Sequence, residues 1–246
     1  MQTFIVVDLE TTGLSPETDH IIEIGALKYV DGTCVEMFSQ LVKPPVSISR
    51  RIYEITGIDD AMVKGQPEIQ EAMEKFLEFV GEEQVLLGHN IRFDYSFLKT
   101  AAKKLKYNFS MKCLDTLGIA RKVLPDLPKK NLETVSSHYH IVNPRAHRAY
   151  EDAKTTAMVY DCMWKEFGML YPEVFQPKDI QIKVKKAEPI TLKQKNYLID
   201  LLKYHKIQGE AFFSEKGKQI DALTKSEASK IIDEIIFQYG RIIRGN

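Results

Sequence analysis

The sequence predicts an α/β fold in which helices flank a mixed β-sheet, followed by a small C-terminal helical module. Three observations favour this fold. Strand-like segments come first in series, strand-like and helix-like segments then alternate, and the last part of the chain carries helical patterns alone. The length of 246 residues suits one large domain, or one domain with a small module. The 44% hydrophobic share is enough for a buried core.

The predicted strands are short and apolar. Residues 3–9 are rich in β-branched side chains, as expected for a strand buried on both faces. Residues 21–30 and 35–42 follow, joined around Asp31-Gly32, a dipeptide favoured in tight hairpin turns. Three strands in series before the alternation predict a mixed sheet. The remaining predicted strands are 84–87 and 112–114.

The predicted helices show apolar side chains three and four residues apart. In the first part of the chain they are 67–80, 94–105, 132–139 and 151–167. Beyond residue 190, Thr191 to Gln194 and Thr224 to Glu227 each fit a capping box, in which the hydroxyl accepts from one amide and the Gln or Glu accepts from another. Helical apolar stripes follow both boxes, so the last region is expected to hold two or three helices.

Charge divides the chain where its pattern changes. The chain has 34 Lys and Arg and 34 Asp and Glu, a net charge of 0. Residues 1–177 hold 20 basic and 25 acidic residues, a net of −5, whereas residues 178–246 hold 14 and 9, a net of +5. We therefore expect a larger domain at 1–176, a linker at 177–189 bracketed by two prolines, and a small basic helical module at 190–246.

Several classes of protein are excluded by what the sequence lacks. No run approaches the roughly 18 consecutive apolar residues of a membrane span. No basic region followed by an apolar core opens the chain, so no secretory signal is expected. The three cysteines lie far apart, which is typical of free thiols in a reducing compartment. The sequence predicts a cytoplasmic protein with no membrane partner.

Two carboxylates end the first predicted strand. Asp8 and Glu10 are two residues apart, so both point to the same face of the strand. Two solvated charges at a strand end are common. However, acidic residues are disfavoured in strands, and two on one face repel each other unless a cation separates them. Hard cations such as Mg²⁺ or Mn²⁺ take oxygen ligands of this kind.

Two further acidic residues follow later strands or loops. Asp94 stands where a predicted strand gives way to a helix, a place where it could instead simply cap the helix. Asp152 follows His147 by five residues, and on one helix these side chains would lie roughly 140° apart. To face one site, His147 must precede the helix, and Pro144 favours a loop there. A histidine with an ordinary pKa of about 6.5 can accept a proton from water at neutral pH.

Three motifs occur in order: D-L-E-T-T-G at 8–13, H-N-I-R-F-D at 89–94 and H-R-A-Y-E-D at 147–152. Together they resemble the exonuclease motifs of the DnaQ-like DEDD family of 3′–5′ exonucleases, which has an RNase H-like fold. The nearest resemblance is to the proofreading exonuclease of bacterial DNA polymerase III and to the exonuclease domain of PolC-type polymerases. His147 lies five residues before Asp152, which matches the histidine subclass, DEDDh; the tyrosine subclass would have its tyrosine at 148, where this chain has Arg.

The resemblance implies roles for individual residues. Asp8, Glu10, Asp94 and Asp152 would hold two divalent metal ions, Mg²⁺ or Mn²⁺, and His147 would be the general base that activates water. Some of the apolar residues that match substrate contacts are equally typical of a core. The substrate-binding residues implied by the resemblance are Thr11, Gly13, Leu14, Ile58, His89, Asn90 and Phe93.

The expected activity is hydrolysis of terminal phosphodiester bonds at the 3′ end of single-stranded DNA, with release of nucleoside 5′-monophosphates. Such an enzyme would serve proofreading or repair, with a DNA polymerase or another replication protein as a partner. One alternative is a 3′–5′ exoribonuclease of the RNase T or oligoribonuclease type, acting on RNA. Another is an accessory protein that binds nucleic acid through residues 190–246.

Overall fold

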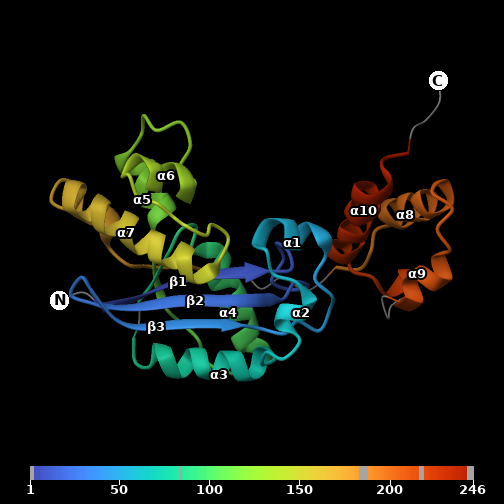
Figure 1. Ribbon diagram of the computed structural model, residues 1–246, viewed down its shortest axis with the longest axis horizontal. Coiled ribbons are helices and arrows are strands. Elements are labelled where there is room, and N and C mark those ends of the chain that lie inside the picture. Colours follow the sequence, from blue (N-terminus) through green and yellow to red (C-terminus); the bar gives the residue numbers. More distant parts are fainter. Residues whose placement is uncertain (1–2, 84, 183–187, 216–218, 243–246) are drawn as a thin grey trace. The chain divides into compact units, whose positions relative to one another are not determined.

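The computed structural model describes residues 3–83, 85–182, 188–215 and 219–242, and it divides the chain into two compact units, residues 1–184 and 185–246 (Figure 1). The first unit contains a six-stranded mixed sheet in the order β3-β2-β1-β4-β5-β6. Strand β1 pairs antiparallel with β2 and parallel with β4, so the predicted mixed α/β fold is confirmed. The strands are β1 (Thr3–Thr11), β2 (Ile21–Val30), β3 (Thr33–Leu41), β4 (Val85–Gly88), β5 (Lys112–Asp115) and β6 (Lys178–Asp179).

Helices cover both faces of this sheet (Figure 1). Helices α3 (Ile69–Val80) and α4 (Arg92–Lys104) pack on one face. The other face carries α5 (Thr116–Val123), α6 (Leu132–His138), α7 (Ala149–Phe167) and the 3₁₀ helix η1 (Pro172–Phe175). Two short helices, α1 (Arg50–Thr56) and α2 (Asp60–Val63), follow β3.

The alternation of β1 decides which face its acidic residues take. Ile5, Val7 and Leu9 belong to the core under α3 and α4. Phe4 and Val6 belong to the core under α5 and α7. Asp8 and Glu10 share the parity of Phe4 and Val6, so they point to the face that α7 covers.

Most predicted elements are present, and the differences have local causes. The hairpin at Asp31-Gly32 has φ values of 50° and 79°, as a two-residue turn of type I′ requires. Helices α1, α2 and α5 were not predicted, because they are short and their side-chain caps, rather than a long apolar stripe, mark their starts. The strand β6 lies inside the predicted linker, where Ile180 and Ile182 pack against the core of the first unit. Residues 183–187 of that linker lie outside the described residues.

The second unit is built around helices α8 (Leu192–Tyr204), α9 (Gly209–Glu215) and α10 (Lys225–Tyr239), with a short 3₁₀ helix, η2 (Ile220–Ala222). Both predicted capping boxes are present, at Thr191 with Gln194 and at Thr224 with Glu227. Its core is made by apolar residues of α8 and α10, including Leu198, Leu201, Ile231 and Ile235.

In the part of the chain that the structure describes, none of the helices combines the length and apolar character needed to cross a bilayer.

Candidate active site

The site is built on the carboxyl end of β1. Strand β4 pairs with β1 only at Ile5 and Val6, so β1 continues past its neighbour. On the other side β2 remains paired, with Gly25 opposite Asp8 and Glu23 opposite Glu10. The end of β1 is therefore held by one neighbouring strand and open along its other edge. This arrangement leaves room there for a side chain from another element.

Asp94, in the first turn of α4, reaches this open edge. Its carboxylate accepts a hydrogen bond of 3.0 Å from the backbone N–H of Leu9, between the two acidic residues of β1. The side chain is buried, with 3% of its surface exposed. Asp94 is not the N-cap residue of α4, which is Ile91, but its carboxylate also accepts a hydrogen bond from its own backbone N–H in the first turn of the helix.

Asp152 and His147 reach the site from the other face of the sheet. Arg148 is the N-cap residue of α7, so His147 precedes the helix and Asp152 lies in its first turns, as predicted. The His147 N–H donates to the Asp152 carboxylate at 3.0 Å, and the Asn143 side-chain amide donates to the same carboxylate. His147 adopts the left-handed backbone region, with φ of 63°, which is unusual for a residue with a side chain. The hydrogen bond to Asp152 helps to hold that conformation.

The start of α7 lies against the backbone of β2. A Cβ atom added to Gly25 would be 2.2 Å from the carbonyl carbon of Ala149 and from the backbone nitrogen of Tyr150. Only glycine permits this approach. Since Gly25 is the partner of Asp8 in the sheet, the contact brings the first turn of α7 over the acidic end of β1.

Burial and mutual repulsion raise the pKa values of the acidic groups. Burial, followed by the charges of Asp94 and Asp152, raises the pKa of Asp8 well above its usual range. Burial raises the pKa of Glu10 to about 8, and Asp152 adds to the effect. Burial also raises the pKa of Asp94 to about 8, although its hydrogen bonds oppose the shift. The pKa of Asp152 is raised by burial as well.

This donor set fits divalent cations. Ligand atoms of Glu10, His147 and Asp152 all lie within 4.8 Å of one another, close enough to share one ion. Carboxylates whose pKa values are raised by each other's charge gain most when a cation joins them. Oxygen-rich sites suit hard cations such as Mg²⁺ and Mn²⁺. Glu10, His147 and Asp152 could thus share one ion, and Asp8 lies close enough to feel the charges of Asp94, Asp152 and Glu10.

The loop after β1 presents one exposed apolar side chain. Leu14, four residues after Glu10 in the sequence, is 83% exposed. The Thr11 hydroxyl donates to the Gly13 carbonyl at 2.6 Å and so orders this loop. A Cβ on Gly13 would lie 2.5 Å from the buried carboxylate of Asp19. This close approach explains why glycine is needed at position 13, and it could not be predicted from the sequence.

The other residues implied for substrate binding have internal partners. Ile58 is fully buried beside Ile22, so its side chain belongs to a core. His89 uses both ring nitrogens, at 2.9 Å from the Thr116 hydroxyl and 2.8 Å from the Lys130 carbonyl, and burial lowers its pKa.

Asn90 and Phe93 begin the segment that leads into α4. The Asn90 side chain is exposed at a left-handed turn with φ of 65°, and the backbone N–H of Asn90 donates to the Asp115 carboxylate. Phe93 is half-buried against Phe97, with ring centroids 5.0 Å apart. Of these two, Asn90 is the one whose side chain lies open to solvent.

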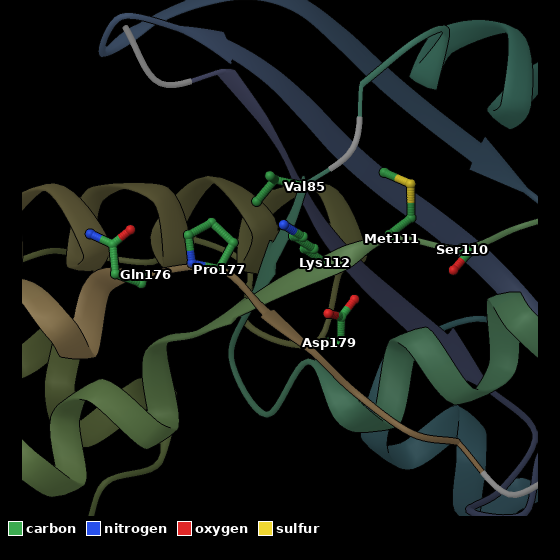
Figure 2. Close-up of a pocket in the computed structure, with 7 residues that line it drawn as sticks. All are labelled: Val85, Ser110, Met111, Lys112, Gln176, Pro177 and Asp179. Atoms are coloured by element: carbon green, nitrogen blue, oxygen red, sulfur yellow. The ribbon is translucent and has the colours of Figure 1, made fainter.

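A surface hollow lies at the amino ends of the parallel strands β4 and β5 (Figure 2). Val85 and Lys112 line it at the amino ends of β4 and β5, and the other lining residues are Ser110, Met111, Gln176, Pro177 and Asp179. Because β4 and β5 run parallel to β1, their amino ends lie away from Asp8 and Glu10. The hollow is therefore separate from the acidic site.

The exonuclease family model matches residues 5–160. The chain is 45% identical over 157 residues to the DNA polymerase III PolC-type of Caldanaerobacter subterraneus subsp. tengcongensis. This alignment covers 64% of this chain and 11% of that protein. Over 172 residues it is 37% identical to the DNA polymerase III subunit epsilon of Aquifex aeolicus, covering 68% of this chain and 85% of that protein. The chain spans about a tenth of the PolC-type relatives.

Among solved structures, exonuclease X in complex with 5′-overhanging duplex DNA matches with a TM-score of 0.55 and 26% identity. The match covers 68% of this chain and 93% of that chain. The matched family region contains every residue of the acidic site and His147.

Proposed function

The chain belongs to the exonuclease family, of the DnaQ and DEDD type, and from this premise we propose that it removes nucleotides from the 3′ end of single-stranded DNA. The products are nucleoside 5′-monophosphates. The observation that carries the proposal is the meeting of four carboxylates and His147 at the carboxyl end of β1. The motif resemblance to this family is confirmed.

Members of the family use divalent metal ions, and a pair of them would stabilise the attacking and leaving oxygens of an in-line displacement. In this chain Asp8, Glu10, Asp94 and Asp152 would hold the ions. His147, exposed on its loop, accepts the proton of the attacking water. No side chain forms a covalent bond with the substrate.

Substrate contacts come from the loop after β1. Leu14, the most exposed side chain of this loop, packs against the terminal base. The hydrogen bond from Thr11 to Gly13 and the close approach of Gly13 to Asp19 order the loop backbone just before Leu14. The apolar contact fits any base, so it favours an exonuclease without sequence preference.

The choice of DNA rests on the relatives, which are components of DNA polymerase III. They also favour proofreading or repair, with a DNA polymerase or another replication protein as partner. RNA is the alternative substrate. The cytoplasmic location remains a prediction.

Single-stranded DNA and RNA of one sequence, labelled at the 5′ end, test the proposal with Mg²⁺ or Mn²⁺. We expect the DNA to shorten one nucleotide at a time, faster than the RNA. Asp8→Asn should abolish shortening, whereas Asp126→Asn, which changes an exposed aspartate, should not. An intact strand with both metals, or an active Asp8→Asn protein, would contradict the proposal. Faster trimming of RNA would select the exoribonuclease.

We also propose that the second unit binds single-stranded nucleic acid. Tyr204 and Tyr239, about half exposed, flank His205, with ring centroids 4.9 and 5.6 Å from its ring. The exposed cations Lys203, Lys206 and Arg241 adjoin these rings in sequence. Aromatic faces for stacking beside basic side chains are typical of such binding.

Salt dependence of binding tests this second role. Replacing Lys203, Lys206 and Arg241 by Ala in the full chain should lower the salt slope of DNA binding by about 2, since each contact contributes about 0.7 on single strands. Lys225→Ala is the matched control, because its amine is already paired with Glu188 at 2.8 Å. An unchanged slope in the triple variant would overturn the proposal.

A further inference from the structure

We propose that Glu23 and Arg148 form a positioning pair that fixes the start of α7, and with it His147 and Asp152, against the acidic end of β1. This inference rests on the proposed function, because it concerns the geometry of that same site. Neither residue is part of the acidic set that could hold metal. Glu23 is the sheet partner of Glu10, and Arg148 directly follows His147.

The Glu23 carboxylate is buried and fully engaged. Its side chain is 1% exposed, and Arg148 Nη2 lies 2.7 Å from Oε1. Arg148 Nε donates to both carboxylate oxygens, at 3.3 and 3.1 Å. The Ala149 N–H donates to Oε2 at 3.0 Å. Because both oxygens already accept hydrogen bonds from α7, Glu23 acts as a link between β2 and the helix rather than as a free ligand.

This link replaces an ordinary helix cap. The first amides of a helix lack partners within the helix, and a nearby Ser, Thr, Asp or Asn usually accepts from one of them. The N-cap side chain of α7, Arg148, makes no such bond. Glu23, far earlier in the chain, accepts from Ala149 instead. Several other helices are capped locally, by Ser49, Asp59, Asp115, Thr191 and Thr224.

A cap supplied by the sheet fixes the helix in space, which a local cap does not. Arg148 holds Glu23 from the loop side, and Ala149 holds it from the helix side. His147 and Asp152 lie just before and just after these two residues. The glycine contact at Gly25 sets how closely α7 approaches β2, and the pair sets its position along the strand. Partners that orient metal-binding residues typically change metal affinity or activity by about 10- to 100-fold when they are removed.

The test compares Glu23→Gln and Arg148→Lys in the full chain. Glutamine keeps the shape of the side chain but loses an acceptor, so its amide faces the donors of α7. Lysine keeps the charge of Arg148 but loses the two-point geometry. We expect each variant to lower kcat by about 10- to 100-fold with KM nearly unchanged. The double variant should lose no more than the worse single variant, because the two act as one unit.

Controls separate positioning from general stability. Glu54→Gln breaks the exposed pair with Arg50, also a Glu–Arg pair, and should leave kcat unchanged. Circular dichroism at the assay temperature reports whether each variant is folded. If Glu23→Gln does not fold, Arg148→Lys decides, since this side chain is 30% exposed and its charge is kept. Folded Arg148→Lys protein with kcat and Mn²⁺ affinity within twofold of the original would overturn the inference.

Mn²⁺ binding, measured by electron paramagnetic resonance without substrate, distinguishes this inference from the proposed function. We expect weaker Mn²⁺ binding in both variants, by at least several-fold. If the original chain bound Mn²⁺ and cut neither DNA nor RNA, the proposed function would fail. The positioning pair would then be tested by the Mn²⁺ affinity of the two variants. Unchanged Mn²⁺ affinity together with unchanged kcat would reject the pair alone.

Discussion

Gly25→Ala tests the close contact between β2 and α7. The new Cβ would lie 2.2 Å from the backbone of Ala149 and Tyr150, whereas ordinary contact begins near 3.4 Å. The helix start would therefore have to retreat by about 1.2 Å, the difference between these distances. Backbone atoms cannot rotate away as a flexible side chain can. Overpacking of this kind costs about 1–3 kcal/mol in the free energy of unfolding.

The same displacement should slow the reaction. A shift of about 1 Å in reacting groups can cost about 100-fold in rate, and Asp152 would move with the helix. Urea unfolding, followed by fluorescence of the single tryptophan, Trp164, gives the free energy of unfolding, and digestion of a 5′-labelled oligonucleotide gives kcat. Gly65→Ala is the matched control, because nothing lies within 4 Å of the added atom. Surface substitutions usually change the free energy of unfolding by less than about 0.5 kcal/mol. If Gly25→Ala changed it by no more than that and left kcat unchanged, the contact would be refuted.

Three further predictions concern the acidic site. The pKa values of Glu10 and Asp94 are about 8 in the folded chain, whereas the unfolded chain releases these protons near about pH 4 to 5. Between these values the folded chain binds more protons, so the free energy of unfolding of the metal-free protein should fall as pH rises toward 8. Calorimetry should show Mg²⁺ raising Tm more at pH 8 than at pH 6; a metal-free Tm that rises with pH would contradict this. His147→Gln should lower kcat by about 100- to 10,000-fold while Mn²⁺ still binds, and lost Mn²⁺ binding would instead make His147 a ligand. Asn143→Ala should lower the free energy of unfolding by about 1–3 kcal/mol in urea titrations, since it removes a donor to Asp152, and no loss would show that this bond is unimportant.

The places of the acidic residues in the fold could be predicted because they follow local rules. Asp8 and Glu10 share a face by strand alternation alone, and the five-residue separation of His147 and Asp152 required a loop before the helix. The strand-to-helix junction placed Asp94 near the same edge. In each case the position follows from the repeat of one element, which can be read along the chain.

Other features depend on contacts between distant segments and could not be predicted. No local sequence pattern predicts that Glu23 is buried, because a glutamate in a strand is equally typical of a solvent-facing position. Its partner, Arg148, lies 125 residues away in the sequence. Ile58 and His89 matched family positions, but only packing shows that one fills a core and the other is held by Thr116 and Lys130. Short helices such as α1 could not be predicted, because seven residues are too few to show a clear helical repeat of apolar side chains.

The most direct test of the proposed reaction uses one DNA strand that carries a 5′ fluorophore and a radiolabelled phosphate linking its last nucleotide. With Mn²⁺, we expect labelled nucleoside 5′-monophosphate to appear first, while the fluorescent strand shortens by one nucleotide at a time. Asp152→Asn should abolish both signals, because it removes one of the carboxylates that meet at the end of β1. Labelled inorganic phosphate, long internal fragments, or full activity of the Asp152→Asn protein would contradict the account.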